Sequence, residues 1–242
     1  MPIIYEPRGK ALEYSPLAAN LYKGCSHGCR YCYAPSATFK KRSVFHSDEF
    51  IKPRSGVLKQ FESDCKKFAG DERECLFSFT TDPYQPCESE HGITRKALKI
   101  ALVNNIKPVI LTKGGKLAEK DFDILKKFSE KKFGVSLTTD CEKESIEWEP
   151  GAALPTERIN SLMEAWTLGI ETFVSFEPVI NPDAVLRMID STCEFVDFYK
   201  VGKLNHHRFQ KEIDWVSFRE SVILKLESLN KKYMIKKDLL AA

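Results

Sequence analysis

The sequence predicts a mixed α/β fold in which helices cover a parallel β-sheet. Two observations carry this prediction. Short apolar runs, rich in β-branched and aromatic residues, alternate about six times with longer segments of helical periodicity, which is typical of β-α-β units. The chain has 242 residues, of which 43% are hydrophobic, so it is long enough to bury one substantial core. A doubly wound open sheet and a barrel both fit this alternation.

The predicted strands are six apolar runs that end in polar residues or in Gly and Pro. In chain order they cover residues 19–22, 75–80, 108–112, 133–138, 172–176 and 195–201. Polar residues follow several of them directly, among them Thr81-Asp82, Lys113, Thr139-Asp140 and Glu177. Because the sites of barrels and of open α/β sheets form at the carboxyl ends of strands, we expect these polar groups to meet on one face.

The predicted helices lie between and after these strands. They cover residues 55–69, 93–105, 119–130, 156–168 and 183–189, and residues 211–231 are expected to form a final amphipathic helix. Two of them have clear start signals. Thr156 is expected to cap one helix, with Glu157 in its first turn, and Asn181 is expected to cap another, with Pro182 at its first position.

The charge and the distribution of apolar residues bear on the expected partners and localisation of the protein. Charged residues make up 29% of the chain and the formal net charge is +3, which is compatible with a nucleic-acid partner without requiring one. No run approaches the roughly 20 apolar residues of a membrane span, and residues 1–16 contain no apolar signal-peptide core. We therefore expect a cytoplasmic protein with no membrane partner, whose cysteines serve metal or redox chemistry.

Three of the eight cysteines lie close together after the first predicted strand. Cys25, Cys29 and Cys32 have the spacing C-x3-C-x2-C within residues 24–32, called the cluster loop below. Three thiolates on one loop can hold three irons of a [4Fe–4S] cluster and leave the fourth iron without a protein ligand. Gly24 and Gly28 allow the backbone to curl closely around a metal. The spacing therefore predicts a metal centre with one open position.

A zinc site is the alternative at this loop, because thiolates suit both zinc and iron–sulfur clusters. Zinc usually takes four protein ligands in a structural site. The fourth would come from His27 or from one of the remaining cysteines: Cys65, Cys75, Cys87, Cys141 and Cys193. On this interpretation the chain is a non-catalytic zinc or iron–sulfur binding module.

The aromatic residue Tyr31, directly before Cys32, favours an iron–sulfur cluster over a zinc site. The pattern C-x3-C-x-aromatic-C after a first strand resembles the signature of the radical S-adenosylmethionine (SAM) superfamily. The resemblance implies an α/β fold with a partial (β/α)6 barrel of the TIM type, in agreement with the six alternations. We expect a single domain over residues 1–242, with an N-terminal extension at 1–18 and a C-terminal helical extension at 206–242.

The same resemblance implies the chemistry. The cofactors would be a [4Fe–4S] cluster and SAM, which binds the open iron and is cleaved reductively to a 5′-deoxyadenosyl radical that abstracts hydrogen from a substrate. The protein would supply binding, orientation and exclusion of side reactions. An external electron donor of the flavodoxin or ferredoxin type is an implied partner, and a monomer is expected.

Further motifs resemble the spore photoproduct lyase-like branch of the superfamily, also labelled DNA repair photolyase-like. They run in order along nearly the whole chain: residues 5–35, FTTDPYQP at 79–86, ILTKGG at 110–115, VSLTTD at 135–140, SFEPV at 175–179 and KVGKLN at 200–205. This branch implies a nucleic acid or a nucleotide base as the substrate. A peptide or a small metabolite is the alternative.

The resemblance also assigns residues to the cofactors. It implies that Cys25, Cys29 and Cys32 ligate the cluster, that Tyr31 lies near the adenine, and that Thr81 and Asp82 hold the SAM amino group. It further implies that Lys113 faces the SAM carboxylate and that Ser136 lies near the ribose. Read alone, Thr81-Asp82 is also a reasonable turn, Lys113 an exposed loop lysine and Ser136 a packed strand residue.

Three other residues are candidates for catalysis. Tyr33 matches one of a tyrosine pair for which a radical relay is proposed in spore photoproduct lyase, and packing against the loop is its alternative. Glu177 is either a barrel-mouth acid or a solvated loop residue. Spore photoproduct lyase has a hydrogen-donating cysteine near the end of its second strand, where this chain has Phe79. In this chain Cys75 or Cys141 would take the role of hydrogen donor instead.

Other features separate this chain from a DNA-lesion enzyme. It has no separate nucleic-acid module and no dense basic stripe with interleaved aromatic residues. The residues at and after the end of the sixth strand are candidates for substrate contacts, including contacts to phosphates: Lys200, Lys203, Asn205, His206 and His207. The two histidines are expected to be surface residues rather than metal ligands. Residues 141–154 are expected to form a surface loop, with a lid over the site as the alternative.

Overall fold

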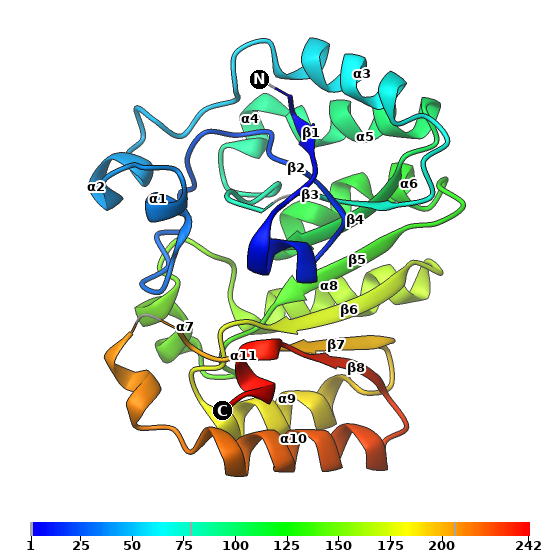
Figure 1. The fold of residues 1–242 in the computed structure, drawn as a ribbon. Helices are drawn as coiled ribbons and strands as arrows, with labels where there is room; N and C mark the ends of the chain where they lie inside the picture. The colour runs from blue at the N-terminus through cyan, green and yellow to red at the C-terminus, as the bar shows by residue number, and fades with distance from the viewer. Residues whose placement is uncertain (1, 78, 206) are drawn as a thin grey trace.

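The computed structural model describes residues 2–77, 79–205 and 207–242, and within them one eight-stranded sheet runs through the molecule in chain order (Figure 1). The strands are β1 Ile4–Tyr5, β2 Leu17–Ala19, β3 Glu74–Phe77, β4 Lys107–Thr112, β5 Lys132–Ser136, β6 Glu171–Phe176, β7 Phe198–Val201 and β8 Lys232–Ile235. β1 pairs antiparallel with β2, and every later neighbour pair is parallel. The six predicted strands correspond to β2 to β7, and the expected partial barrel is confirmed.

The α-helices pack mainly on the outer side of this sheet (Figure 1). They are α1 Ala34–Ala37, α2 Arg42–Phe45, α3 Val57–Lys67, α4 Glu88–His91, α5 Ile93–Val103, α6 Phe122–Leu125, α7 Glu142–Trp148, α8 Pro155–Thr167, α9 Pro182–Thr192, α10 Trp215–Ser228 and α11 Lys237–Leu240. Three 3-10 helices add η1 Gly9–Glu13, η2 Gly115–Asp121 and η3 Arg208–Lys211. None of the helices in the described part of the chain has the length and apolar character of a membrane span.

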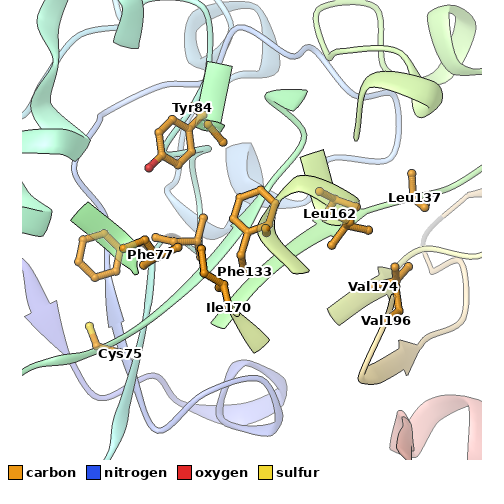
Figure 2. Close-up of a cluster of buried hydrophobic side chains, with 14 of the residues drawn as sticks. Cys75, Phe77, Tyr84, Phe133, Leu137, Leu162, Ile170, Val174 and Val196 are labelled. Atoms are coloured by element: carbon orange, nitrogen blue, oxygen red, sulfur yellow. The ribbon is translucent and has the colours of Figure 1, made fainter. Parts of the chain in front are cut away.

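Side chains alternate between the two faces of the sheet, as β-structure requires. The outer face joins the helices in the main hydrophobic core, and part of this layer, with Phe77, Phe133 and Val174, is drawn in Figure 2. The inner face carries a second, smaller apolar cluster of Ala18, Leu76, Val109 and Phe173. The inner face lines the space called the lumen below.

This alternation decides the place of Cys75. Cys75 is fully buried in the outer core, where Figure 2 places it among the apolar side chains, while its neighbour Leu76 belongs to the inner cluster. Cys75 therefore points away from the lumen, and its interpretation as a substitute hydrogen donor is wrong.

The two predicted helix caps have different outcomes. Asn181 caps α9 as expected: its side chain accepts a hydrogen bond from the Ala184 N–H at 3.1 Å. Thr156 does not cap α8, because the helix begins one residue earlier, at Pro155, and Leu154 occupies the cap position. The Glu157 side chain instead accepts from the Leu154 N–H at 3.1 Å. Proline at N1 is a favoured start and overrides the threonine signal.

Other elements also differ from the sequence-based expectation. Residues 119–130 form the end of η2 and the short α6 rather than one helix. The C-terminal segment is not purely helical, because β8 follows α10 and adds a parallel strand to the sheet. Residues 141–154 contain α7, and Trp148 and Glu149 are buried, so this segment is not a plain surface loop. Residue 78, within the predicted strand 75–80, and residue 206 lie outside the described residues.

The edges of the sheet meet through side chains rather than through a strand ladder. The described pairings end at β1 and at β8. Glu13, from the N-terminal segment, lies 3.8 Å from Lys236 Nζ and accepts a hydrogen bond from the Lys237 N–H at 3.4 Å. The Lys236 ammonium also lies 4.8 Å from the centre of the Tyr14 ring. The residues next to β8 thus contact those that precede β2.

Candidate functional site

The cluster loop leaves the carboxyl end of β2 and leads into α1 (Figure 1). Cys29 is buried, Cys25 and Cys32 are partly exposed, and all three are free thiols. The Cys32 N–H donates to the Cys29 carbonyl at 3.0 Å, which turns the chain between these two cysteines. The loop therefore carries all three cysteines beyond the carboxyl end of β2, where the site was expected, with Cys29 and Cys32 joined by a turn.

Side chains from distant segments hold the backbone of this loop. The buried Gln85 amide accepts from the Ser26 N–H at 3.0 Å and donates to the Gly24 carbonyl at 3.1 Å. His46 Nδ1 lies 2.7 Å from the Cys25 carbonyl. The Arg42 guanidinium donates to the Gly28 carbonyl at 3.0 Å and also to that of Cys29. Sequence reasoning missed these three residues, because their partners are local neither in sequence nor in secondary structure.

Gly24 is required by a close approach of the backbone. A Cβ at this position would meet the Phe45 carbonyl oxygen and would lie 3.1 Å from the Phe50 ring. The neighbouring Cys25 N–H donates to that same carbonyl at 3.4 Å. The glycine predicted to let the loop curl therefore lets it pack against α2.

Asp82 connects three segments at the carboxyl edge of the sheet. Its Oδ1 accepts from the Tyr84 N–H at 2.8 Å and the Thr112 hydroxyl at 2.6 Å, and its Oδ2 accepts from the Lys113 N–H at 2.7 Å. His27 Nδ1, on the cluster loop, lies 3.5 Å from Oδ2. These contacts give Asp82 a positioning role between β3, β4 and the cluster loop. Its direct contact with SAM stays a prediction.

A buried ion pair that sequence reasoning missed lies beside the predicted SAM ligands. The Arg158 Nη1 of α8 lies 2.6 Å from Glu149 Oε2, and both residues are at most 1% exposed. The Tyr31 hydroxyl donates to the Glu149 carboxylate, and Lys113 Nζ lies 4.0 Å from it. Glu149 therefore joins Tyr31 and Lys113, which are far apart in sequence. Glu149 lies within residues 141–154, which were expected to form a surface loop, so no sequence signal pointed to it.

Ser136 and Thr81 complete the set of predicted SAM contacts. Both are buried, and Ser136 lies on β5, where its carbonyl accepts from Arg158 Nη1 at 2.9 Å. Lys113 is also largely buried, with 15% of its side chain exposed, so it is not an exposed loop lysine. The structure brings Lys113 and Tyr31 to one place, with the ammonium 5.7 Å from the ring centre.

The electrostatics of the loop fit a metal cluster. Burial raises the pKa of Cys29 to about 12 and also raises the pKa of Cys25 and Cys32. A positive metal centre would reverse this preference, because coordination deprotonates a thiol. Within the described residues, no three His, Cys, Asp or Glu side chains converge on a single metal ion. In a cubane each cysteine binds a different iron, so a [4Fe–4S] cluster does not need such convergence.

Two buried polar atoms on the same loop have no hydrogen-bond partner within the described part of the chain. They are Ser26 Oγ and His27 Nε2. Burial, against the opposing charge of Asp82, lowers the pKa of His27, so the imidazole is neutral near pH 7. Buried polar groups are normally paired. The donor set and these two orphaned atoms therefore fit a bound [4Fe–4S] cluster with a polar cofactor beside it.

The three candidates for catalysis lie in different places. The Tyr33 hydroxyl donates to the Phe79 carbonyl at 2.9 Å. Glu177 follows β6, and only 17% of its side chain is exposed, so it is not a solvated loop residue. Cys141 is exposed at the start of α7. Burial, with the charges of Cys32, Tyr5 and Glu177, raises the pKa of Tyr33. Their roles remain predictions.

Fold and site together define a radical SAM enzyme: a partial β/α barrel with a three-cysteine loop after the first parallel strand. The family model described as "Radical SAM superfamily" matches residues 19–196. The chain belongs to the radical SAM superfamily, whose members use a [4Fe–4S] cluster and SAM.

Relatives in sequence include two proteins described as uncharacterized. MJ0683 of Methanocaldococcus jannaschii is 30% identical over 189 residues, which cover 77% of this chain and 69% of that protein. Rv2578c of Mycobacterium tuberculosis is 23% identical over 181 residues, which cover 72% of this chain and 52% of that protein. The chain thus spans about half the length of the mycobacterial relative.

Solved structures share the fold at low identity. Spore photoproduct lyase complexed with dinucleoside spore photoproduct superposes with a TM-score of 0.69 and 12% identity, over 96% of this chain and 79% of that chain. Streptococcus suis SuiB bound to S-adenosylmethionine gives a TM-score of 0.65 and 15% identity, over 90% of this chain and 49% of that chain. The chain spans about half the length of SuiB. At these identities the likeness establishes the fold.

Proposed function

We propose that this protein binds a [4Fe–4S] cluster through Cys25, Cys29 and Cys32, binds SAM beside it, and takes a hydrogen atom from a nucleic acid or a nucleotide base. The observation that carries the proposal is the convergence of Tyr31, Lys113 and the buried Glu149 next to the three-cysteine loop. When bound, the cluster and SAM supply a 5′-deoxyadenosyl radical. The substrate would lose its hydrogen atom in the lumen, shielded from solvent.

The residues of the chain would bind and orient the cofactor. Lys113 carries a positive charge that suits the SAM carboxylate, and Thr81 offers a hydroxyl to its amino group. Asp82 fixes the backbone that bears Lys113, and Ser136 lies on the next strand for the ribose. We further propose one catalytic domain over residues 1–242.

The nucleobase preference is supported by the lining of the lumen. The inner apolar cluster is flanked by partly buried aromatic side chains, including Tyr14, Phe79 and Phe198. Flat aromatic rings provide stacking surfaces for bases. Spore photoproduct lyase, which shares the fold, was solved with a dinucleoside lesion.

A second candidate substrate is a peptide. The shared fold includes SuiB, which was solved bound to its precursor peptide SuiA. This chain spans 48% of that protein, so the likeness leaves about half of SuiB unmatched.

An electron donor of the flavodoxin or ferredoxin type is proposed as a partner. Arg30, Lys40 and Lys41 are exposed on and just after the cluster loop, and a basic surface steers acidic partners to it.

The test is anaerobic purification followed by reaction with dithionite and SAM. We expect a brown protein with about four irons per chain that releases 5′-deoxyadenosine. Cys29→Ala should lose both iron and product, whereas the matched variant Cys193→Ala, at the distant end of α9, should keep both. A colourless protein with one zinc would contradict the proposal.

The substrate class is tested with deuterated substrates. Label should enter 5′-deoxyadenosine from deuterated nucleotides or oligonucleotides, and binding of nucleic acid should weaken as salt rises. If label entered 5′-deoxyadenosine from deuterated peptides only, the substrate would be a peptide and the nucleobase proposal would be wrong.

A further inference from the structure

A second group of polar residues lies in the lumen on β6, β7 and β8, on strands other than those that carry the predicted SAM contacts. The register pairs Ser175 of β6 with Lys200 of β7, and Lys200 with Met234 of β8, so Lys200 shares the inner face with Ser175. Tyr14 covers this face: its hydroxyl bonds the Ser175 hydroxyl, and its carbonyl accepts from Lys200 Nζ at 3.0 Å.

Glu177 has one carboxylate oxygen without a donor. Its Oε2 accepts from the Ser175 hydroxyl at 3.3 Å, but Oε1 is buried and has no hydrogen-bond partner among the described residues. Lys236 Nζ stands 3.9 Å from Oε1, beyond hydrogen-bonding distance. An unpaired buried carboxylate oxygen calls for a donor that the protein itself does not provide.

The backbone makes room for this carboxylate. A Cβ on Gly202 of the adjacent segment would lie 2.7 Å from Glu177 Oε1 and 2.9 Å from its Cγ. Any other residue at position 202 would therefore push the carboxylate out of its place. Glu177 is therefore held in a defined position against the backbone of Gly202 and is not a loose surface side chain.

Lys200 supplies donors at the same place. Its ammonium has three N–H bonds, and one of them is directed to the Tyr14 carbonyl. The Nζ lies 4.4 Å from the centre of the Tyr14 ring and 5.4 Å from that of Phe173. Burial, with the neighbouring Lys236 and against the attraction of Glu177, lowers the pKa of Lys200 to about 8. Lys200 is thus a buried cation on the inner face near a carboxylate.

The charge balance selects the ligand. Burial raises the pKa of Glu177 and lowers the pKa of Lys200, so it favours the neutral form of each group, and the site does not attract an anion strongly. A neutral ligand with a donor and an acceptor side by side fits it better. The Tyr14 and Phe79 rings meet edge to face, with 5.8 Å between their centres, and offer an aromatic wall to a planar ring.

We propose that Glu177 and Lys200 bind the lactam edge of a nucleobase, that is, a ring N–H next to a carbonyl. Glu177 Oε1 accepts from the ring N–H, and the Lys200 ammonium donates to the carbonyl oxygen. Uracil, thymine, guanine and hypoxanthine have this edge, whereas adenine and cytosine do not. The pair determines specificity and rests on the proposed function. An amide-containing peptide fits the planar aromatic wall less well.

The test is equilibrium binding of nucleosides to the anaerobic, cluster-loaded protein in the presence of SAM. Uridine and inosine should each bind at least about tenfold more tightly than cytidine. They should exceed N3-methyluridine, which lacks the ring N–H, by the same factor. Equal binding of uridine and N3-methyluridine would overturn the proposal, and this comparison needs no variant. Binding of a dipeptide amide in preference to every nucleoside would also overturn it.

Two variants locate the effect. Glu177→Leu should abolish the preference for uridine over N3-methyluridine, and Lys200→Met should weaken the binding of uridine about tenfold. Glu62→Gln and Lys66→Met, at an exposed ion pair on α3, should leave both the preference and the affinity unchanged. A preference for uridine that survives in Glu177→Leu, or an unchanged affinity for uridine in Lys200→Met, would overturn the proposal. Release of 5′-deoxyadenosine is measured in parallel: if it persists without nucleoside discrimination, this inference fails alone, and if it is absent in the wild type, the proposed function fails.

Discussion

Gln85 holds the cluster loop on both sides of Cys25, accepting from the Ser26 N–H and donating to the Gly24 carbonyl. It is completely buried, so water cannot replace either bond. No pattern in the sequence marks a glutamine in YQP as a support for a loop 60 residues earlier. Residue identity predicts the thiol ligands because their chemistry is local, whereas the supports of those ligands depend on tertiary contacts.

Replacing Gln85 should therefore affect the cluster before it affects the fold. We expect Gln85→Ala to lower the iron and sulfide content per chain and to reduce the free energy of unfolding by about 1–3 kcal/mol, because two backbone groups lose buried partners. Iron analysis and denaturant unfolding measure the two effects. Gln210→Ala, on η3, is the control, and an unchanged iron content in Gln85→Ala would refute the supporting role.

Lys200 gives the protein a pH dependence of stability. Its pKa is about 8 in the folded protein, whereas that of an unfolded lysine is about 10.4. Between these values the unfolded chain holds a proton that the folded protein has released, so the free energy of unfolding rises with pH. We expect the wild type to gain stability relative to Lys200→Met from pH 8 to pH 10. Denaturant titrations at these pH values measure the difference in the free energy of unfolding between the wild type and Lys200→Met. If the burial of Lys200 were unimportant, this difference would be the same at pH 8 and at pH 10.

At the scale of elements, the pair Glu149–Arg158 joins α7 and α8 to the end of β5. Arg158 also donates to the Ala153 carbonyl at 2.7 Å and to the Ser136 carbonyl at 2.9 Å. Burial, outweighed by the charges of Arg158 and Lys113, leaves the pKa of Glu149 lowered, so the carboxylate is ionised. Two helices and a strand are thus tied by one guanidinium.

Removing this guanidinium should be costly. Arg158→Met leaves a buried carboxylate without its guanidinium partner, and we expect a loss of about 3–5 kcal/mol in the free energy of unfolding. Arg187→Met removes a guanidinium from Asp140 in an exposed pair and should cost at most about 1 kcal/mol. Chemical denaturation of both variants compares them directly. Equal losses would mean that burial of the first pair adds nothing.

Elements with a long apolar period were predictable, and short ones were not. β4 to β6 and helices α3, α5, α8 and α9 have runs long enough to show a period in sequence, and β3 and β7 overlap the longer apolar runs 75–80 and 195–201. β8 has four residues, KYMI, between two lysine-rich stretches, and β1 has two. β2 lies two residues before its predicted start, because Leu17 and Ala18 are paired with β3, whereas residues 20–22 lead to the cluster loop. Tertiary pairing decides such short segments.

At the scale of the whole molecule, the C-terminal segment completes the sheet. β8 pairs with β7, and Leu239 of α11 is fully buried in the main core, although it is only three residues from the end of the chain. The lumen residue Lys236 lies between these two elements. The C-terminal extension predicted to be helical is therefore part of the barrel wall.

Leu239 and its neighbour provide a matched pair for testing this role. We expect Leu239→Ala to lower the free energy of unfolding by about 2–5 kcal/mol, because it opens a cavity in the core. Leu240→Ala, at a residue that is 52% exposed, should change it by no more than about 0.5 kcal/mol. Thermal or denaturant unfolding measures the loss in the free energy of unfolding for each variant. Similar losses in the two variants would show that Leu239 does not anchor α11 in the core.

The sequence predicted the fold class through alternation, and the motif around Cys25, Cys29 and Cys32 indicated the family. It did not predict how the site is held, because Glu149, Arg158 and Gln85 have no local pattern. Nor did it show that Lys200 lies opposite Ser175, two residues before Glu177, which depends on the register of β6 and β7. Register is set by packing and is not visible in a single strand.

The contacts between Glu13, Lys236 and Lys237 have a mechanical consequence. A barrel that closes by a strand ladder can widen only by breaking a row of backbone hydrogen bonds. Here the described contacts along this seam involve side chains: an ion pair, ring contacts, the hydrogen bonds of Tyr14 with Ser175 and Lys200, and one long hydrogen bond to the Lys237 N–H. Such a seam can part and re-form while the parallel sheet stays intact. A large substrate would then enter the lumen from the side, through this seam, rather than along the axis of the barrel.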